Sequence, residues 1–248
     1  MVIIKKPEEI AIMSQGGKIL AKILKNIARS AKPGTSTFRL NQLAGKEIEK
    51  YKAKPAFKNY RGYPFILCTS VNEEVVHGFP LAKKILKPGD IIGLDLGIEY
   101  KGYFTDMAIT CPVGKISPLA KKLIKVTKKA LFLGLKQTKP GNYIGDISSV
   151  IQKFAEKNGF SVVRDLAGHG VGKNLHEDPL IPNFGQPKTG LKLEEGMTLA
   201  IEPMVNTSGH RVETLDDEWT VVTSDKSLSA HFEHTVVVTK RGYKILTK

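Results

Sequence analysis

The chain repeats one order of breaks and strand-like runs at an offset of 107 residues, and this repeat constrains its fold most. Lys32-Pro33-Gly34 and Lys139-Pro140-Gly141 each separate two runs of helical periodicity. Leu86-Lys87-Pro88-Gly89 and Leu193-Glu194-Glu195-Gly196 have the same offset, and each precedes apolar strand-like sequence. The repeated order predicts a duplicated α/β (α+β) chain with two similar halves.

Each half is predicted to carry two helices followed by strands. The four helices are expected from Pro7 to the first Lys-Pro-Gly break, from Thr37 to Tyr51, from Ser117 to Gln137 and from Tyr143 to Asn158. Strands are expected near 65–68, 199–203, 232–239 and 243–246. Because neither half would close a site alone, we expect a single catalytic domain over residues 1–248, with pseudo-repeats at about 7–114 and 115–248.

Residues 91–106 are predicted to form a β-hairpin that turns at Lys101-Gly102. In this register Gly97 faces Asp106, and Asp95 is the diagonal neighbour of Asp106 at roughly 7–8 Å. Gly97 is expected to leave the space between the two carboxylates empty. Two buried carboxylates repel each other unless a proton or a metal ion intervenes. The alternative, two solvated aspartates on a strand face, stays open from the hairpin alone.

Three further candidate ligands lie in the second half of the chain. His169 lies among Gly168, Gly170 and Gly172, while Glu202 and Glu233 lie in apolar strand-like runs. Two Asp, two Glu and one His suit Mn, Fe, Co or Zn. Bridging carboxylates commonly hold two such ions roughly 3.5–4 Å apart. The set therefore predicts a dinuclear metal site, although any one of these residues alone would be more typical of a surface or core position.

Net charge and cysteine content limit the partners and the cellular compartment that can be expected. The 38 Lys and Arg against 24 Asp and Glu give a net charge of +14, which permits attraction to a polyanion such as RNA. No arginine-rich tract or nucleic-acid motif is present, so we expect no sequence-specific nucleic-acid binding. Cys68 and Cys111 are too few for a disulfide framework and suit a reducing cytoplasm. Neither a signal peptide nor a membrane-spanning segment is expected.

The combined motifs resemble type I methionine aminopeptidases over nearly the whole chain. The resemblance is carried by Asp95 and Asp106, by Gly168-His169-Gly170-Val171-Gly172 with His176-Glu177, and by Ile201-Glu202-Pro203, Phe232-Glu233-His234-Thr235 and Asn72-Glu73-Glu74-Val75-Val76-His77-Gly78. It implies the pita-bread fold, in which two pseudo-twofold-related halves carry antiparallel sheets and outer helices. It also implies the compact bacterial form, a cytoplasmic monomer that removes the N-terminal methionine from nascent polypeptides when the second residue is small.

The resemblance assigns roles to individual residues. It implies that Asp95 binds one of two divalent ions (Co, Mn, Fe(II) or Zn), that His169 and Glu202 bind the other, and that Asp106 and Glu233 bridge both. Glu202 would also shuttle a proton, while His77 and His176 would contact the scissile amide and the developing oxyanion. The methionine pocket would be lined by Phe57, Tyr60, Tyr63, Cys68, Leu175 and Trp219. Phe57 and Leu175 depart from the residues frequent in the family, a Cys and an aromatic respectively, which puts the pocket shape in question.

Two alternatives remain at this stage. One is a proline-specific peptidase of the same fold, although such enzymes usually carry a large extra N-terminal domain. The other is a non-catalytic relative that binds RNA or the ribosome through its positive charge. The presence of all five candidate ligands favours the enzyme.

Overall fold

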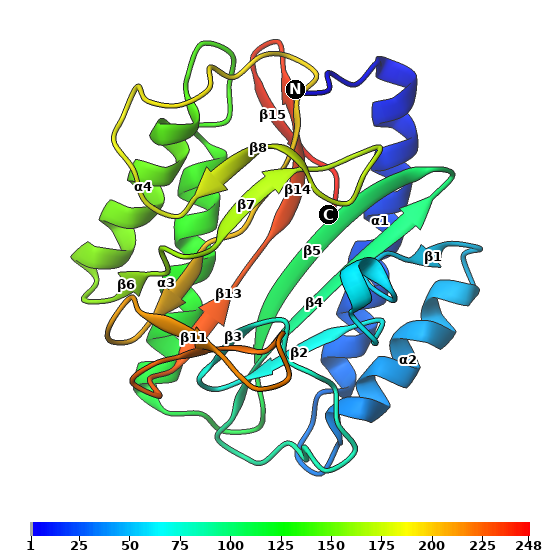
Figure 1. Ribbon diagram of the computed structural model, residues 1–248, viewed down its shortest axis with the longest axis vertical. Coiled ribbons are helices and arrows are strands. Elements are labelled where there is room, and N and C mark those ends of the chain that lie inside the picture. Colours follow the sequence, from blue (N-terminus) through cyan, green and yellow to red (C-terminus); the bar gives the residue numbers. More distant parts are fainter. Residues whose placement is uncertain (1) are drawn as a thin grey trace.

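A central layer of strands lies between two pairs of helices in the computed structural model, which describes residues 2–248 (Figure 1). The helices are α1 (Pro7–Ser30), α2 (Thr37–Glu49), α3 (Pro118–Leu135) and α4 (Ile144–Lys157), with a short 3-10 helix, η1 (Tyr60–Gly62). The α1–α2 pair and the α3–α4 pair cover opposite sides of the strands. Among residues 2–248, no helix has both the length and the apolarity that a bilayer span requires.

The strands of residues 2–248 form four antiparallel sheets, of which two are large. In the first, β1 (Lys54–Pro55), β4 (Ile91–Tyr100) and β2 (Cys68–Val71) lie in that order, with β5 (Tyr103–Pro112) also paired to β4. The second large sheet has the order β15 (Gly242–Ile245), β14 (His234–Thr239), β9 (Thr198–Ile201), β7 (Ala167–Gly170) and β8 (Glu177–Pro182). Two small sheets contain β13 (Ser229–His231), β10 (Met204–Asn206) and β6 (Ser161–Val162), and β11 (Val212–Thr214), β12 (Val221–Thr223) and β3 (Glu74–Val76).

Helix boundaries agree with the predicted ones to within about two residues because their local determinants are present. The Ser117 hydroxyl accepts a hydrogen bond from the Ala120 N–H at 3.1 Å and so caps α3. On α1, Pro7 occupies the first turn, and the apolar face is fully buried against β4 and β5. A second core lies between α3, α4 and the strands of the other large sheet.

Each half contains an equivalent backbone hydrogen bond, and the two bonds are related by the 107-residue offset. The Gly34 N–H donates to the Leu86 carbonyl at 2.8 Å, and the Gly141 N–H donates to the Leu193 carbonyl at 3.2 Å. Both glycines have positive φ, +85° and +88°, a conformation that favours glycine. The predicted α/β fold with antiparallel sheets and outer helices is confirmed. The shared bonds support duplication, and the boundaries of the pseudo-repeats stay a prediction.

The β4–β5 hairpin has the predicted register, with Gly97 opposite Asp106 and Asp95 opposite Ala108. The expectation that Gly97 leaves an empty space was wrong. A Cβ atom on Gly97 would lie 2.7 Å from Cε1 of Phe57. The missing side chain therefore makes room for the Phe57 ring, which becomes a wall beside the two aspartates.

The strand predicted near 65–68 begins later, at Cys68. The N–H groups of Ile66 and Leu67 instead donate to Oδ1 of Asn41 on α2, at 2.9 and 3.1 Å. A side chain thus satisfies these two backbone donors, and no strand partner is needed. The strand predicted over 232–239 likewise begins later, at His234, because Phe232 and Glu233 form a break between β13 and β14.

The two halves are joined directly beside the candidate ligands. The Thr235 hydroxyl accepts from the Asp106 N–H at 2.9 Å and donates to the Asp106 carbonyl at 2.8 Å. The Thr110 hydroxyl makes the same pair of bonds with the backbone of His231, at 2.9 and 2.8 Å. Two threonines, one from each half, therefore hold β5 against the β13–β14 segment.

Candidate metal centre and substrate pocket

All thirteen predicted site residues line one cavity of about 150 Å³ between the two large sheets. The structure thus brings together side chains from residue 57 to residue 233. They are Phe57, Tyr60, Tyr63, Cys68, His77, Asp95, Asp106, His169, Leu175, His176, Glu202, Trp219 and Glu233. This shared location does not by itself test their individual roles, which stay predictions.

The five candidate ligands come from both halves of the chain. One ligand atom each of Asp106, His169 and Glu233 lies within 4.8 Å of the others. Nε2 of His169 is 3.5 Å from Oε1 of Glu202. Asp95 and Asp106 share a face of the hairpin. The arrangement gathers oxygen and nitrogen donors at the distances that a bound cation would span.

The backbone holds two of these acids in place. The Asp106 main chain is fixed on both sides by Thr235. The Glu233 N–H donates to the Ala108 carbonyl at 2.8 Å, across the junction of the halves. Glu233 lies in the two-residue break between β13 and β14, so the interruption directs its carboxylate toward Asp106.

Burial and mutual repulsion raise the pKa values of the four carboxyl groups. Burial raises the pKa of Asp106 to about 7, with a further contribution from Glu202. Burial likewise raises the pKa of Glu202 to about 7. Burial, then the neighbouring carboxylates, raises the pKa of Asp95 and of Glu233 well above the usual range. The protein therefore gathers four carboxyl groups where burial and mutual repulsion disfavour their ionised forms.

The residues present fit a divalent cation. Oδ1 of Asp95 and Oε1 of Glu233 are buried and make no hydrogen bond within residues 2–248. Ionised carboxylate oxygens accept only, and an unsatisfied buried acceptor is costly. A cation among these atoms would satisfy them and offset the repulsion, and the oxygen-rich set with one imidazole is typical of Mn, Fe, Co or Zn sites.

The His169 ring is oriented to offer a lone pair to the cluster. Its Nδ1 is 2.8 Å from the Gly170 carbonyl, which can only accept. Nδ1 must therefore carry the proton, which leaves Nε2 of the neutral ring as an acceptor beside Glu202. Backbone contacts of this kind commonly fix the tautomer of metal-binding histidines.

His176 lies next to His169, with ring centroids 4.2 Å apart and the rings nearly perpendicular. Its Nδ1 is 2.8 Å from the Tyr60 hydroxyl. Partial burial is the main cause that lowers the pKa of His176 to about 3, so the ring is neutral at pH 7. When Tyr60 donates to Nδ1, the proton of the ring is on Nε2, where it can be donated to a substrate oxygen.

His77 occupies a left-handed backbone conformation, with φ of +58°. Such a conformation is uncommon for residues other than glycine, although asparagine, aspartate and histidine adopt it more often than the rest. The adjoining Gly78 is held on both sides: its N–H donates to the Ser70 hydroxyl at 3.3 Å, and its carbonyl accepts from the Thr69 N–H at 2.8 Å. Tyr63 reaches the same carbonyl with its hydroxyl at 3.4 Å.

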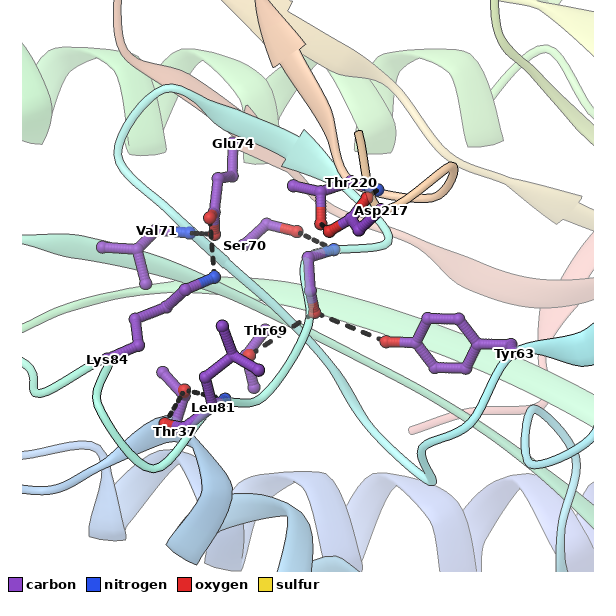
Figure 2. A network of polar contacts seen from close by, with 11 residues as sticks. Thr37, Tyr63, Thr69, Ser70, Val71, Glu74, Leu81, Lys84, Asp217 and Thr220 are labelled. Carbon is purple, nitrogen blue, oxygen red and sulfur yellow. Dashed lines mark hydrogen bonds and ion pairs between the residues drawn. The ribbon is translucent and has the colours of Figure 1, made fainter. Parts of the chain in front are cut away.

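Figure 2 shows how this network continues around the turn before His77. The Glu74 carboxylate accepts from the Val71 N–H at 2.7 Å and pairs with the Lys84 ammonium at 2.6 Å. A Cβ atom on Gly78 would lie 2.9 Å from Oε2 of Glu74 and still closer to the Thr69 carbonyl. The network therefore requires glycine at position 78 and fixes the backbone that presents His77 to the cavity.

The remaining predicted residues form apolar walls. Tyr63, Cys68 and Leu175 are buried in a cluster with Phe57, against which Trp219 packs. The Tyr63 and Trp219 rings meet edge to face at 5.1 Å. Burial, then the Asp95 charge, raises the pKa of the Cys68 thiol well above its usual value. A neutral thiol fits the predicted wall and not a nucleophile.

Several cavity residues were not predicted from the sequence. Val76, Leu166, Ala167 and Met204 complete the walls. His231 is buried with Nε2 3.3 Å from Oε2 of Glu202, in a geometry that falls short of a hydrogen bond. A sequence signal was available: His231 is two positions before Glu233, and alternate residues of an extended chain share a face.

Comparisons with known proteins agree with this geometry. Residues 11–240 match the model of metallopeptidase family M24. The chain is 49% identical to methionine aminopeptidase 1 of Bacillus subtilis, with all of both chains covered. It is 49% identical to methionine aminopeptidase of Clostridium acetobutylicum over 247 residues, which cover 100% of this chain and 99% of that one.

Solved structures give the same result. A crystal structure of methionine aminopeptidase from Thermotoga maritima superposes with a TM-score of 0.99, at 48% identity, over all of both chains. A prolidase from Pyrococcus horikoshii has a TM-score of 0.80 at 24% identity, and the match covers 100% of this chain but 64% of that one, so it shows only the shared fold. The chain is a member of metallopeptidase family M24 and has the fold of the bacterial methionine aminopeptidases that it matches.

Proposed function

We propose that this protein is a methionyl aminopeptidase that removes the N-terminal methionine from polypeptides whose second residue is small. The observation that carries the proposal is the cluster of two buried carboxylates, two partly buried carboxylates and one buried imidazole beside an apolar, aromatic-walled cavity. Full-length similarity to proteins named methionine aminopeptidase supports it.

Two divalent ions are proposed at this site. Asp95 would bind one ion, His169 and Glu202 the other, and Asp106 and Glu233 would bridge them. Five side chains, with two buried carboxylate oxygens that make no hydrogen bond, offer enough donors for a pair of ions. Co, Mn, Fe(II) and Zn are all compatible with the donor set. When bound, such ions supply Lewis-acid polarisation of the scissile carbonyl and lower the pKa of water.

The protein's own residues would then move the protons and hold the substrate. Glu202 would accept a proton from the attacking water and pass it to the leaving amine, since a carboxylate placed beside the reacting groups can act as general base and then general acid. His176 would donate its Nε2–H to the oxygen that gains negative charge. His77 would accept the hydrogen bond of the scissile amide N–H.

The cavity walls support selection of methionine. Phe57, Tyr60, Tyr63, Cys68, Leu175 and Trp219 would surround the side chain of the first residue. Aromatic and sulfur-containing walls suit a thioether, while a charged side chain would lose its hydration there. The crowded metal centre would leave little room for the second residue of the substrate.

The proposal is tested by mass spectrometry on peptides that differ at the first two positions. Met-Gly, Met-Ala and Met-Ser peptides should lose one residue, whereas Met-Lys and Met-Phe peptides should be nearly inert. X-Pro peptides serve as the comparison for a proline-specific enzyme of the same fold. If residues other than Met were released from X-Pro peptides faster than Met is released from Met-Ala peptides, the enzyme would be proline-specific. The proposed metal site would not be affected by that result.

We propose that this protein is a cytoplasmic monomer and that its partners are nascent polypeptide chains. The net charge of +14 favours a weak electrostatic association with RNA-rich ribosomes. Helix α3 supports association with ribosomes because it carries five lysines and no acidic residue that would offset their positive charge. These lysines are Lys121, Lys122, Lys125, Lys128 and Lys129. Co-sedimentation with ribosomes should weaken steeply as salt increases. Failure to co-sediment at low salt would leave the lysines as a solvated surface.

A further inference from the structure

The side chain of Lys5 enters the protein interior and forms an ion pair with Glu177. The two side chains are 1% and 3% exposed. The Lys5 ammonium also donates to the Ile3 carbonyl at 2.9 Å. Lysine is almost never fully buried unless it is paired, so this contact between residues 172 positions apart is a specific structural feature.

Glu177 directly follows His176, and its carboxylate closes the loop that carries His176. Oε1 of Glu177 accepts from the Asn174 N–H at 2.9 Å, while Oε2 pairs with Lys5. The carboxylate therefore spans the loop from residue 174 to residue 177. Leu175, a cavity wall, and His176 lie between these two points.

Other contacts hold Lys5 and this loop together. The Lys5 N–H donates to the Gly196 carbonyl at 3.0 Å, which fixes the backbone from which the side chain extends. The Lys5 side chain passes against Gly172, where a Cβ atom would collide with its Cε and lie 3.0 Å from its Nζ. A second, more exposed pair joins Glu9 of α1 to Lys173 at 3.3 Å.

We infer that Lys5 is a positioning residue for the substrate-binding loop, an inference that rests on the function proposed above. Its ammonium group holds Glu177 inside the protein and thereby fixes His176 beside His169 and Leu175 in the cavity wall. The extended segment before α1 thus contributes to the site without touching the substrate.

The physical reason is the cost of an unpaired buried charge. Without Lys5, the Glu177 carboxylate would lie in a dry environment with one backbone donor, and it would move toward water. Because His176 is the adjacent residue, its ring would move as well. Donors to a developing oxyanion act only when they are placed within a few tenths of an ångström.

The test compares Lys5→Met with Lys6→Met, a matched change of the adjacent, exposed lysine. The enzyme is loaded with Mn²⁺ and assayed on a Met-Ala-Ser peptide. Lys5→Met should lower kcat/KM by about 10- to 100-fold, since a displacement near 1 Å can cost that much. Metal content by mass spectrometry should stay at the wild-type level, because the five ligands are untouched. Lys6→Met should match the wild type in both measurements.

Hydrogen–deuterium exchange gives a readout independent of catalysis. Residues 172–178 should exchange faster in Lys5→Met than in Lys6→Met. The double variant Lys5→Met/Glu177→Gln, which removes both charges, covers the case in which Lys5→Met fails to fold. It should melt near the wild-type temperature and still show the lowered kcat/KM and the faster loop exchange.

The outcomes distinguish failure of the positioning role of Lys5 from failure of the proposed aminopeptidase function. A folded Lys5→Met or double variant with kcat/KM and loop exchange within twofold of the wild type would overturn the positioning role. If the wild type itself releases no methionine, the proposed function fails, and faster exchange of the loop in Lys5→Met would still support its anchoring by Lys5.

Discussion

Metal binding at this site should depend steeply on pH below neutrality. The pKa values of Asp106 and Glu202 are raised to about 7, chiefly by burial. A raised pKa means that the protein without metal favours the protonated acid, whereas a bound cation requires the ionised carboxylate. Affinity must therefore fall as pH falls through 7.

The magnitude follows from these two pKa values. At pH 6 most of each group is protonated, so a cation must displace protons from both, whereas at pH 8 it displaces few. Each displaced proton costs about one tenfold change in affinity per pH unit below the pKa. Because the two groups interact, we expect a loss of affinity of roughly 10- to 100-fold between pH 8 and pH 6. Asp95 and Glu233, whose pKa values are raised further, add to this loss.

Isothermal titration calorimetry with Mn²⁺ under nitrogen measures both the affinity for the metal and the number of protons released on binding. At pH 6, titrations in buffers of different ionisation enthalpy should give about two or more protons released per binding event. Glu156→Gln, on the exposed face of α4, should release as many protons as the wild type. Affinity that is constant from pH 6 to pH 8, or release of less than one proton, would refute the argument that these carboxyl groups share a dry, repulsive site.

Three further predictions concern single side chains. Asp106→Ala should lose both metal, by elemental analysis, and turnover, because it removes the proposed bridge; full activity would rule out the two-metal arrangement. His176→Ala should lower kcat by about 10²- to 10³-fold while metal content stays near the wild type, and metal loss would mean that His176 is a ligand. Gly78→Ala should lower the melting temperature and kcat together, because a Cβ would collide with the Thr69 carbonyl; an unchanged melting temperature would show that the turn can adapt.

Local rules account for what the sequence predicted well. The turn at Lys101-Gly102 sets the register of the hairpin, and a period of two then places Asp95 and Asp106 on one face. Helix starts at Pro7 and Ser117 follow from capping preferences that involve only neighbouring residues. The five candidate ligands were recognised because their motifs are short and contiguous.

Contacts between distant segments account for what was missed. Phe57 fills the space beside Gly97, and no local pattern states which ring will do so. His231 approaches Glu202 only because β13 pairs with β10 and Thr110 holds the His231 backbone. The pair of Lys5 and Glu177 joins the start of the chain to its second half, and two lysines in succession near a terminus resemble an ordinary solvated run.

The arrangement of the chain in two halves explains why the ligands can be placed so closely. The first half supplies Asp95 and Asp106 from one hairpin, a pair whose charges repel and whose two carboxylates could hold an ion only weakly. The second half supplies His169, Glu202 and Glu233 from three separate strands or strand ends. Two threonine hydroxyls hold the halves together within a few residues of these acids, at Asp106 and His231. The interface that completes the fold is therefore also the place where five donors converge. A substitution that weakened the contact between the two halves should therefore lower the metal affinity first.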